Sequence, residues 1–380
     1  MITDLNAQIA NADSSSTIGH LLHLATEVER LSAGVAEYDS SELISSTAEV
    51  GSIRYVDDGT LRVYDSDNWR NILNYHPSQA PTPPSFTFQG SSFGYTMGGI
   101  GSPNKLNTIE KYSFTSDANG TDVGDLLAGR RYGSGNNSST NGYHSAHSDN
   151  NNVIEKFPFS SDGNSTDAAD LTQARGRGTA ASADNGYQNG GFNGGPAYYT
   201  MIYKFPFEAD NNATNLGDIA EAHVSGTGHT SPTHGYANSG SSGTNVNSYT
   251  IEKFLFSNEG SVTDVADLSK YLYGASEASS TNHGYASGGA NGSIPPPGVT
   301  YINEIVKFSF TSDGADTDVG DLTAVKFNRG GSSSTTHGYN AGGFPPNLDV
   351  IDKFAFAADG NATDVGDLTE VKRHAAGTQV

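Results

Sequence analysis

Three short motifs recur six times, in the same order, through most of this 380-residue chain. The first is Gly-Tyr, with its tyrosines at Tyr95, Tyr143, Tyr187, Tyr236, Tyr285 and Tyr339. Successive tyrosines lie 48, 44, 49, 49 and 54 residues apart, which gives a period near 50. Six copies at such a period indicate a repeat architecture, in which each unit buries its apolar face against its neighbours.

The other two motifs indicate β-strands. A Lys-aromatic-x-Phe motif begins at Lys111, Lys156, Lys204, Lys253, Lys307 and Lys353, and a Thr-Asp-Val-Gly-Asp-Leu type begins at Thr121, Thr166, Thr214, Thr263, Thr317 and Thr363. Aromatic residues two apart, such as Phe308 and Phe310, lie on one face of a strand. The segments between the two motifs are rich in Asp, Gly and Asn, which favours tight hairpin turns. A Gly/Ser/Thr/Ala-rich run then leads to the next Gly-Tyr, so four short strands fit each unit.

A ring of such units is the predicted fold. The chain is only 34% hydrophobic, but its 17 Phe, 19 Tyr and 1 Trp follow the repeat, which argues against disorder. Small sheets cannot bury enough surface alone, and radial packing solves this while protecting their edges. Residues 85–380 supply about 49 residues per unit. We therefore predict a mainly β, six-bladed propeller, with an open solenoid as the alternative.

Ring closure has two candidate strands. Ser85 to Phe88 and Arg373 to Val380 overlap in their alignment to the repeat, so either could complete a blade shared by both ends of the propeller. The segment not used would be an extra edge strand or a tail.

A mostly basic position follows the third motif. Four residues beyond its last Leu or Ile stand Arg130, Arg175, His223, Leu272, Lys326 and Lys372. The order of Gly-rich strand end, aromatic strand, turn, and Leu followed by a basic residue resembles kelch-type repeats over residues 85–380. The tryptophan usual in that family is absent from these repeats. This resemblance implies a six-bladed propeller and supplies no catalytic residue.

Residues 1–84 form a different region. Residues 1–12 and 16–32 have helical spacing, and we expect residues 1–50 to be a helical anchor or assembly segment. Residues 51–75 predict a small β-hairpin unit with Asp58-Gly59 at its turn. The prolines of residues 76–84 predict a stiff, extended linker.

The sequence Gly-Ser-Ile-Arg-Tyr through Leu-Arg-Val-Tyr to Trp69 is similar to elements of tail-fibre and other structural proteins of tailed phages. Acidic, cysteine-free, Gly/Asn/Ser-rich propellers are likewise similar to virion proteins of marine and cyanobacterial phages. The resemblance implies a non-enzymatic virion protein, a tail appendage that attaches to a host-surface glycan or protein. A capsid decoration or head-fibre protein, a glycan-degrading enzyme and a cellular kelch-type scaffold are the alternatives. Residues 1–75 would bind other virion proteins, and the helices could form a homotrimer.

Composition excludes several other functions. With no Cys there is no disulfide, thiol nucleophile or cysteine metal site. The formal charge of −22 opposes nucleic-acid binding, and no segment is long and apolar enough to insert into a membrane. We accordingly expect no cofactor and no nucleic-acid partner.

Candidate ligand groups are mostly explained by the repeat itself. Asp pairs such as Asp318 and Asp321 could bind Ca²⁺, but they recur in nearly every unit, which favours a structural role over a metal or a hydrolytic pair. His234, His283 and His337 precede Gly-Tyr in three consecutive units; a metal near the axis is possible for them, and a strand-end hydrogen bond is the favoured interpretation.

The loops that break the repeat are the predicted ligand site. Asn-x-Ser/Thr sequences at Asn119, Asn164, Asn212 and Asn361 all fall in the same hairpin turn, so turn formation explains them without glycosylation. The segments from Asn193 to Tyr199 and from Ile294 to Gly298 differ from their counterparts. Because function concentrates in variable loops on a rigid scaffold, we select Asn193, Tyr198, Tyr199 and Tyr301 as ligand-binding candidates.

Overall fold

The computed structural model describes residues 53–56, 60–64, 69–73, 88–147, 151–172, 178–191, 199–222, 225–241, 247–258, 262–291, 300–327 and 330–380. The chain divides into two compact units, Met1–Pro84 and Ser85–Val380. The predicted helices at residues 1–12 and 16–32, and the linker at 76–84, lie outside the described residues. None of the described residues forms a helix long and apolar enough to cross a membrane.

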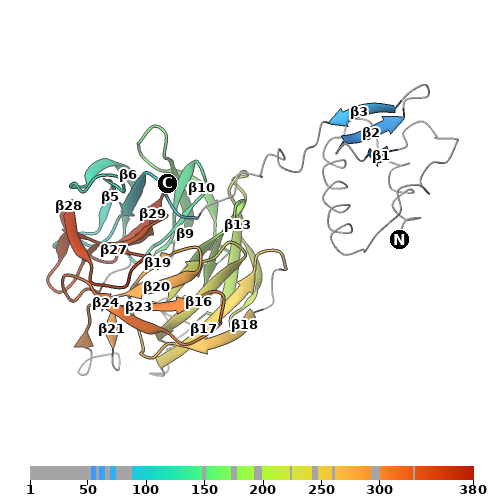
Figure 1. Cartoon of the computed structure of the whole chain (residues 1–380). Helices are drawn as coiled ribbons and strands as arrows, with labels where there is room; N and C mark the ends of the chain where they lie inside the picture. The colour runs from blue at the N-terminus through green and yellow to red at the C-terminus, as the bar shows by residue number, and fades with distance from the viewer. Residues whose placement is uncertain are drawn as a thin grey trace. The chain divides into compact units, whose positions relative to one another are not determined.

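The first unit contains a small antiparallel sheet with the order β1-β2-β3 (Figure 1). Its strands are β1 (Ile53–Val56), β2 (Thr60–Tyr64) and β3 (Trp69–Leu73). The predicted hairpin is confirmed, since Val56 pairs with Thr60 across the turn. Trp69 begins a third strand opposite Tyr64, which the sequence did not predict.

The second unit is a six-bladed β-propeller, as predicted (Figure 1). Each blade is a four-stranded antiparallel sheet that extends from an innermost strand at the axis to an outermost strand at the rim. In that order, blade 1 consists of β29 (Ala376–Gln379), β4 (Phe93–Met97), β5 (Leu106–Ser113) and β6 (Thr121–Arg130). Blade 2 consists of β7 (Ser134–Asn137), β8 (Asn141–His147), β9 (Asn151–Pro158) and β10 (Thr166–Asp170). Blade 3 consists of β11 (Gly178–Ala181), β12 (Asn185–Asn189), β13 (Met201–Pro206) and β14 (Thr214–Asp218).

The remaining blades repeat this order. Blade 4 consists of β15 (Thr227–Thr230), β16 (His234–Ser241), β17 (Asn247–Leu255) and β18 (Val262–Asp267). Blade 5 consists of β19 (Ser276–Ser279), β20 (His283–Ser287), β23 (Glu304–Ser309) and β24 (Thr317–Asp321). Blade 6 consists of β25 (Gly331–Ser333), β26 (His337–Gly343), β27 (Leu348–Ala355) and β28 (Thr363–Lys372). A short extra ribbon, β21 (Ala290–Asn291) with β22 (Thr300–Tyr301), projects from blade 5.

The ring is closed, so the open solenoid is wrong. Each innermost strand contacts the innermost strand of both neighbouring blades, in the cycle β7, β11, β15, β19, β25, β29. Of the two closure candidates, the C-terminal segment supplies the strand, because β29 pairs with β4 from Ala376–Met97 to Gln379–Gly94. Of the other candidate, Ser85 to Phe88, only Phe88 belongs to the described residues; two residues further on, Gly90 forms a single bridge with Ser334.

Strand direction gives the propeller two different faces. Each innermost strand begins at the end of the propeller where one blade is connected to the next. It ends at the opposite end, where a tight turn joins it to the second strand of its blade. The turns between third and fourth strands lie at that second end as well, and we name it the turn face. The opposite end, the loop face, carries the blade-to-blade connections and the connections between second and third strands, including the β21–β22 ribbon.

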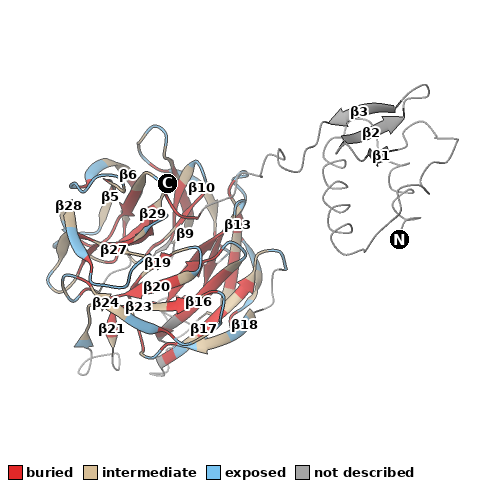
Figure 2. Cartoon of the chain, in the orientation of Figure 1, coloured by how far each residue is buried: buried red, intermediate tan, exposed pale blue. Residues whose placement is uncertain are grey.

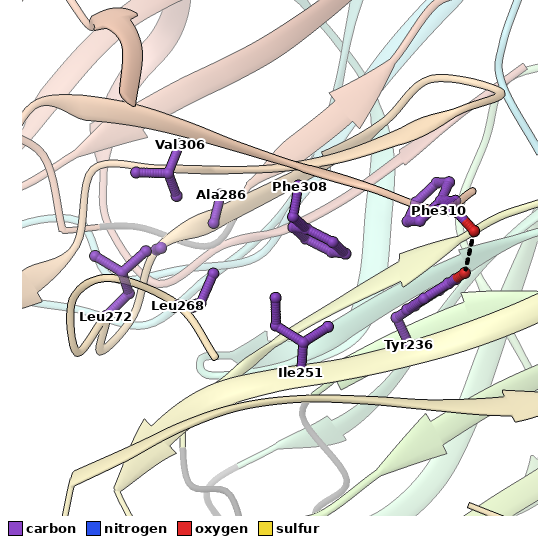
Figure 3. Close-up of a cluster of buried hydrophobic side chains, with 9 residues drawn as sticks. Tyr236, Ile251, Leu268, Leu272, Ala286, Val306, Phe308 and Phe310 are labelled. Atoms are coloured by element: carbon purple, nitrogen blue, oxygen red, sulfur yellow. Dashed lines mark hydrogen bonds between the residues drawn. The ribbon is translucent and has the colours of Figure 1, made fainter. Parts of the chain in front are cut away.

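The repeated aromatic residues form the contacts between blades. Each Gly-Tyr tyrosine packs its ring against the last phenylalanine of the Lys-aromatic-x-Phe motif in the next blade, with ring centroids 4.5–5.1 Å apart. Figure 3 shows one of these pairs, in which the Tyr236 hydroxyl donates to the Phe310 carbonyl at 3.5 Å. The glycine before each tyrosine leaves room for the other aromatic ring: a Cβ on Gly186 would lie 2.3 Å from Phe205. The motifs therefore describe blade packing.

Three buried ion pairs also cross between blades, and they explain the basic position at Arg130, Lys326 and Lys372, whereas Arg175 and His223 lie outside the described residues. Arg130 pairs with Glu155 at 2.8 Å, Lys326 with Asp352 at 2.9 Å, and Lys372 with Glu110 at 2.6 Å. In each pair the acid belongs to the third strand of the following blade, directly before the motif lysine. Where Leu272 replaces the base, Val306 replaces the acid, and both belong to one apolar cluster (Figure 3). At this boundary both positions are therefore apolar.

A second set of ion pairs lies near the turn face. The motif lysines Lys111, Lys156, Lys253, Lys307 and Lys353 reach the hairpin-turn aspartates of the next blade, Asp162, Asp210, Asp313, Asp359 and Asp117, at 2.5–2.7 Å. These pairs are partly exposed, and exposed pairs of this kind contribute about 0–1 kcal/mol each. Figure 2 shows that exposure to solvent increases from the buried inner strands to outer strands such as β28.

Candidate ligand-binding face

The repeated Asp residues have structural roles. Asp122, Asp318 and Asp364 each accept a hydrogen bond from the backbone N–H of the glycine two residues later, at 3.1–3.2 Å. That glycine lies under the next blade, since a Cβ on Gly320 would come within 2.3 Å of the Gly360 carbonyl oxygen. Among the described residues, no group of three or more His, Cys, Asp or Glu side chains is arranged to hold a metal ion.

The hairpin-turn asparagines also join blades. The side-chain oxygens of Asn164, Asn212, Asn361 and Asn119 accept backbone N–H groups from Asp125, Asp170, Asp321 and Asp367 of the preceding blade, at 2.9–3.1 Å. A glycan attached to the nitrogen of such an amide would have to be accommodated beside this contact. Turn and blade packing therefore account for these asparagines.

The three histidines that precede Gly-Tyr stand at the starts of second strands. Nδ1 of His234 and of His337 each lies 2.8 Å from the hydroxyl oxygen of the preceding threonine. Burial lowers the pKa of His234, His283 and His337, and a motif lysine near each adds to this effect. His234 and His337 thus have the strand-end hydrogen bond that the sequence favoured.

Of the predicted loop residues, Tyr199 and Tyr301 belong to the loop face. Asn193 and Tyr198 lie outside the described residues. Tyr199 is partly buried, and its backbone N–H donates to Gly191 at 3.0 Å. Tyr301, at the end of β22, is also partly buried and takes part in a cluster of aromatic rings from several blades.

This cluster, which we name the aromatic arc, consists of Tyr132, Tyr273, Tyr301, Phe327, Phe344 and His374. Tyr273 stacks on Phe327 with ring centroids 5.4 Å apart and an angle of 15°. Tyr301 contacts Phe327 at 6.1 Å and Phe344 at 5.7 Å, both edge to face. His374 continues the arc, 4.9 Å from Phe327 and 4.3 Å from Tyr132.

Unusual backbone geometry marks one end of the arc. Tyr132 has φ 59° and His374 has φ 57°, in the left-handed region that non-glycine residues rarely adopt. Gly274 occupies the equivalent position in blade 4 with φ 65°. Such conformations cost about 1–3 kcal/mol each and are found most often at functional sites. Ser225, with φ 63°, holds the equivalent position before β15, so the conformation recurs in the blade-to-blade connections; the arc differs only in placing large side chains, Tyr132 and His374, at two of these positions.

Two arginines flank the arc. The guanidinium carbon of Arg373 lies 4.4 Å from the centre of the Phe344 ring, and that of Arg131 lies 5.3 Å from the Tyr132 ring. Arg373 is partly exposed, and its Nε is buried without a hydrogen-bond partner among the described residues. Buried polar groups normally have partners, so this one requires an explanation.

The axis offers little space for a ligand. The six innermost strands enclose a cavity of about 50 Å³, and Phe88 closes it at the turn face. The Phe88 carbonyl accepts hydrogen bonds from Gln379 at 2.6 Å and Asn137 at 3.4 Å, and the Gln89 amide donates to Ser279 and Ser334. A few water molecules fit such a volume.

A second hollow, of about 350 Å³, is open to solvent and is lined by Glu221, Ser248, Tyr249, Thr250, Asp267 and Leu268. Its carboxylates, Glu221 and Asp267, do not belong to any group of three or more His, Cys, Asp or Glu side chains that could hold a metal ion among the described residues. The aromatic arc is the more distinctive candidate.

Comparison with known proteins supports the fold alone. No protein-family model and no curated protein matches the chain. Among solved structures, the structure of YjhT is similar with a TM-score of 0.54 and 12% identity, over 66% of this chain and 88% of that chain. Because 224 chains of solved structures match, the propeller by itself does not select a function.

Proposed function

We propose that this chain is a non-enzymatic structural protein of a tailed-phage virion with kelch-type repeats, and that its propeller attaches to a host-surface glycan or protein. The observation that carries the attachment role is the difference between the faces. The chain enters the propeller through Phe88, Gln89 and Gly90 at the turn face. The aromatic arc lies on the opposite face, where it is available to a partner.

The virion part of the proposal is supported by the resemblance of residues 51–75 to phage structural proteins. In it, residues 1–75 bind other virion proteins and a homotrimer is the expected assembly. A tail appendage is favoured over a capsid decoration because an attachment surface has to reach the host.

The location is tested by peptide mass spectrometry of purified virions, followed by immunogold labelling with an antibody against the propeller. We expect the chain in intact particles, with gold at the tail. Gold on the capsid would favour the decoration role, and absence from virions would contradict both.

The function is tested with the purified full-length chain. We expect saturable binding to host cells and no binding to cells of an unrelated bacterium. Incubation with isolated host glycans should release no new reducing ends. If glycans were cleaved, and if Asp318→Asn with Asp321→Asn abolished the cleavage, the enzyme alternative would replace this proposal.

A further inference from the structure

We infer that the aromatic arc with Arg373 is a binding site for an anionic sugar, so that the surface ligand is a glycan carrying carboxylate or sulfate groups. This inference rests on the proposed attachment function and names the chemical class of its ligand. It is carried by Arg373, whose side chain has no hydrogen-bond or ion-pair partner among the described residues and lies directly against a platform of aromatic rings.

The guanidinium of Arg373 makes no ion pair or hydrogen bond with any described residue, although the chain has 42 acidic side chains. The bases at the neighbouring position are used differently: Lys372, one residue earlier, is fully buried against Glu110. An arginine offers a planar fork of N–H donors that matches a carboxylate or sulfate group. A ligand anion would supply the acceptor that the buried Nε lacks.

The rings beside Arg373 suit the other part of a sugar. Aromatic faces carry partial negative charge, and the C–H faces of a pyranose ring carry partial positive charge, so the two stack. Tyr301 and Phe344 meet edge to face at 5.7 Å and therefore present surfaces in two orientations. Tyr301 adds a hydroxyl for hydrogen bonding, which phenylalanine does not.

The site is held in place before a ligand arrives. The backbone of Arg373 exchanges two hydrogen bonds with Ile100, at 2.7 and 3.1 Å. The side chain of Asn347, three residues after Phe344, donates to the Gly101 carbonyl at 3.1 Å. Blades 6 and 1 are thereby joined at this point, and a rigid site loses less entropy on binding.

The overall acidity of the chain does not prevent anion binding here. At physiological ionic strength the Debye length is about 8 Å, so exposed charges further away are largely screened. The arc is flanked by Arg131 and Arg373. The hairpin-turn aspartates are on the turn face, where motif lysines pair with them.

The experiment measures binding of the full-length chain to matched probes by calorimetry. Oligogalacturonate is compared with its neutral methyl ester, and dextran sulfate with dextran. We expect the charged member of at least one pair to bind at least 10-fold more tightly than its neutral form, since a hydrogen bond to a charged group changes affinity about 10- to 100-fold.

Arg373→Gln should remove that difference, Arg373→Lys should retain part of it, and Tyr301→Ala should weaken both members of the pair. Lys105→Gln is the matched control, because it removes the same charge from the loop face outside the arc. Thermal unfolding followed by circular dichroism checks that each variant is folded.

The inference is overturned if no anionic probe binds, if Arg373→Gln binds as the wild type does, or if Lys105→Gln causes an equal loss. Host-cell binding that persists in Arg373→Gln would overturn the inference and leave the attachment function intact. Sugar binding that depends on Arg373, in a chain absent from virions, would contradict the virion proposal alone.

Discussion

Two neighbouring blade boundaries, 4–5 and 5–6, use the same two backbone positions but different side chains. At the first, Leu272 and Val306 belong to one apolar cluster. At the second, Lys326 and Asp352 form an ion pair with both side chains fully buried. Burial lowers the pKa of Lys326, while the charge of Asp352 acts in the opposite direction.

The two boundaries show what the fold requires. A buried position between blades has to be filled and its polar groups have to be satisfied, but it does not have to be ionic. Buried ion pairs lose hydration, and apolar replacements of similar volume are often as stable. Removing only one member of a buried ion pair leaves the other charge without a partner, which destabilises the fold. Four predictions test this difference.

The largest expected effect comes from breaking the ionic boundary. Lys326→Met should destabilise the chain by about 3–5 kcal/mol, because it leaves the carboxylate of Asp352 buried without its cation. The measurement is the free energy of unfolding by urea. Leu272→Met, at the equivalent apolar position, is the control and should cost less than about 1.5 kcal/mol. Equal losses in the two variants would show that the boundaries do not differ as we describe.

The apolar boundary should instead be sensitive to acid. Nδ1 of His229 in blade 4 lies 3.1 Å from the Ala278 carbonyl of blade 5, and burial lowers its pKa to about 4. The folded state holds neutral imidazole, so the unfolded chain binds more protons between pH 4 and about 6.5. The stabilisation of the folded state that depends on neutral His229 is fully present above pH 6.5. It is lost as pH falls toward 4, and the loss is on the order of 3 kcal/mol.

His229→Gln tests this, with unfolding measured at pH 7 and pH 5. We expect a smaller stability difference between the two pH values than in the wild type. Some dependence should remain, because burial also lowers the pKa of His144 to about 3. An unchanged pH profile would exclude His229 as a source of acid sensitivity.

Converting one boundary into the other should have a smaller effect. The double variant Lys326→Leu with Asp352→Val reproduces the blade 4–5 pair, and we expect stability from neutral to about 2 kcal/mol above wild type. Comparison with Lys326→Leu alone gives the coupling between the two sites. If the double variant were less stable than this single variant, the positions would not be exchangeable.

The smallest effect belongs to the outer ion pairs. Lys307→Ala removes a partner from Asp359, which is 54% exposed, and should cost less than about 1 kcal/mol. The loss should shrink in 0.5 M salt, whereas the effect of Lys326→Met should change little. A large loss that salt does not affect would contradict this ranking.

Most of the propeller could be predicted because its packing repeats in the sequence. Gly-Tyr, Lys-aromatic-x-Phe and the Asp-rich turn mark the second strand, third strand and third-to-fourth-strand turn of each blade. The basic position was visible, but its acidic partners were not recognised. Glu155 belongs to the next blade from Arg130, and strand register decides that they meet. The apolar pair Leu272 and Val306 was a partial signal for the pairing, because Arg175 corresponds to Tyr203 and does not follow it.

The candidate site was predictable only in part. Tyr301 was identified because its loop breaks the repeat, and it does belong to the aromatic arc. Phe327, Phe344 and His374 were missed because each comes from a different connection. Nothing local indicates which loops meet once six blades have closed into a ring.

The pairing of β29 with β4 has a consequence for biosynthesis. Blade 1 is synthesised as β4, β5 and β6, and its innermost strand, β29, follows only after about 250 further residues. At translation rates of about 5–20 residues per second, an unpaired strand edge is exposed for roughly 12–50 s. A nascent chain in this state invites pairing with the wrong partner, so protection by a chaperone, or by residues that discourage edge pairing, would be most valuable at β4.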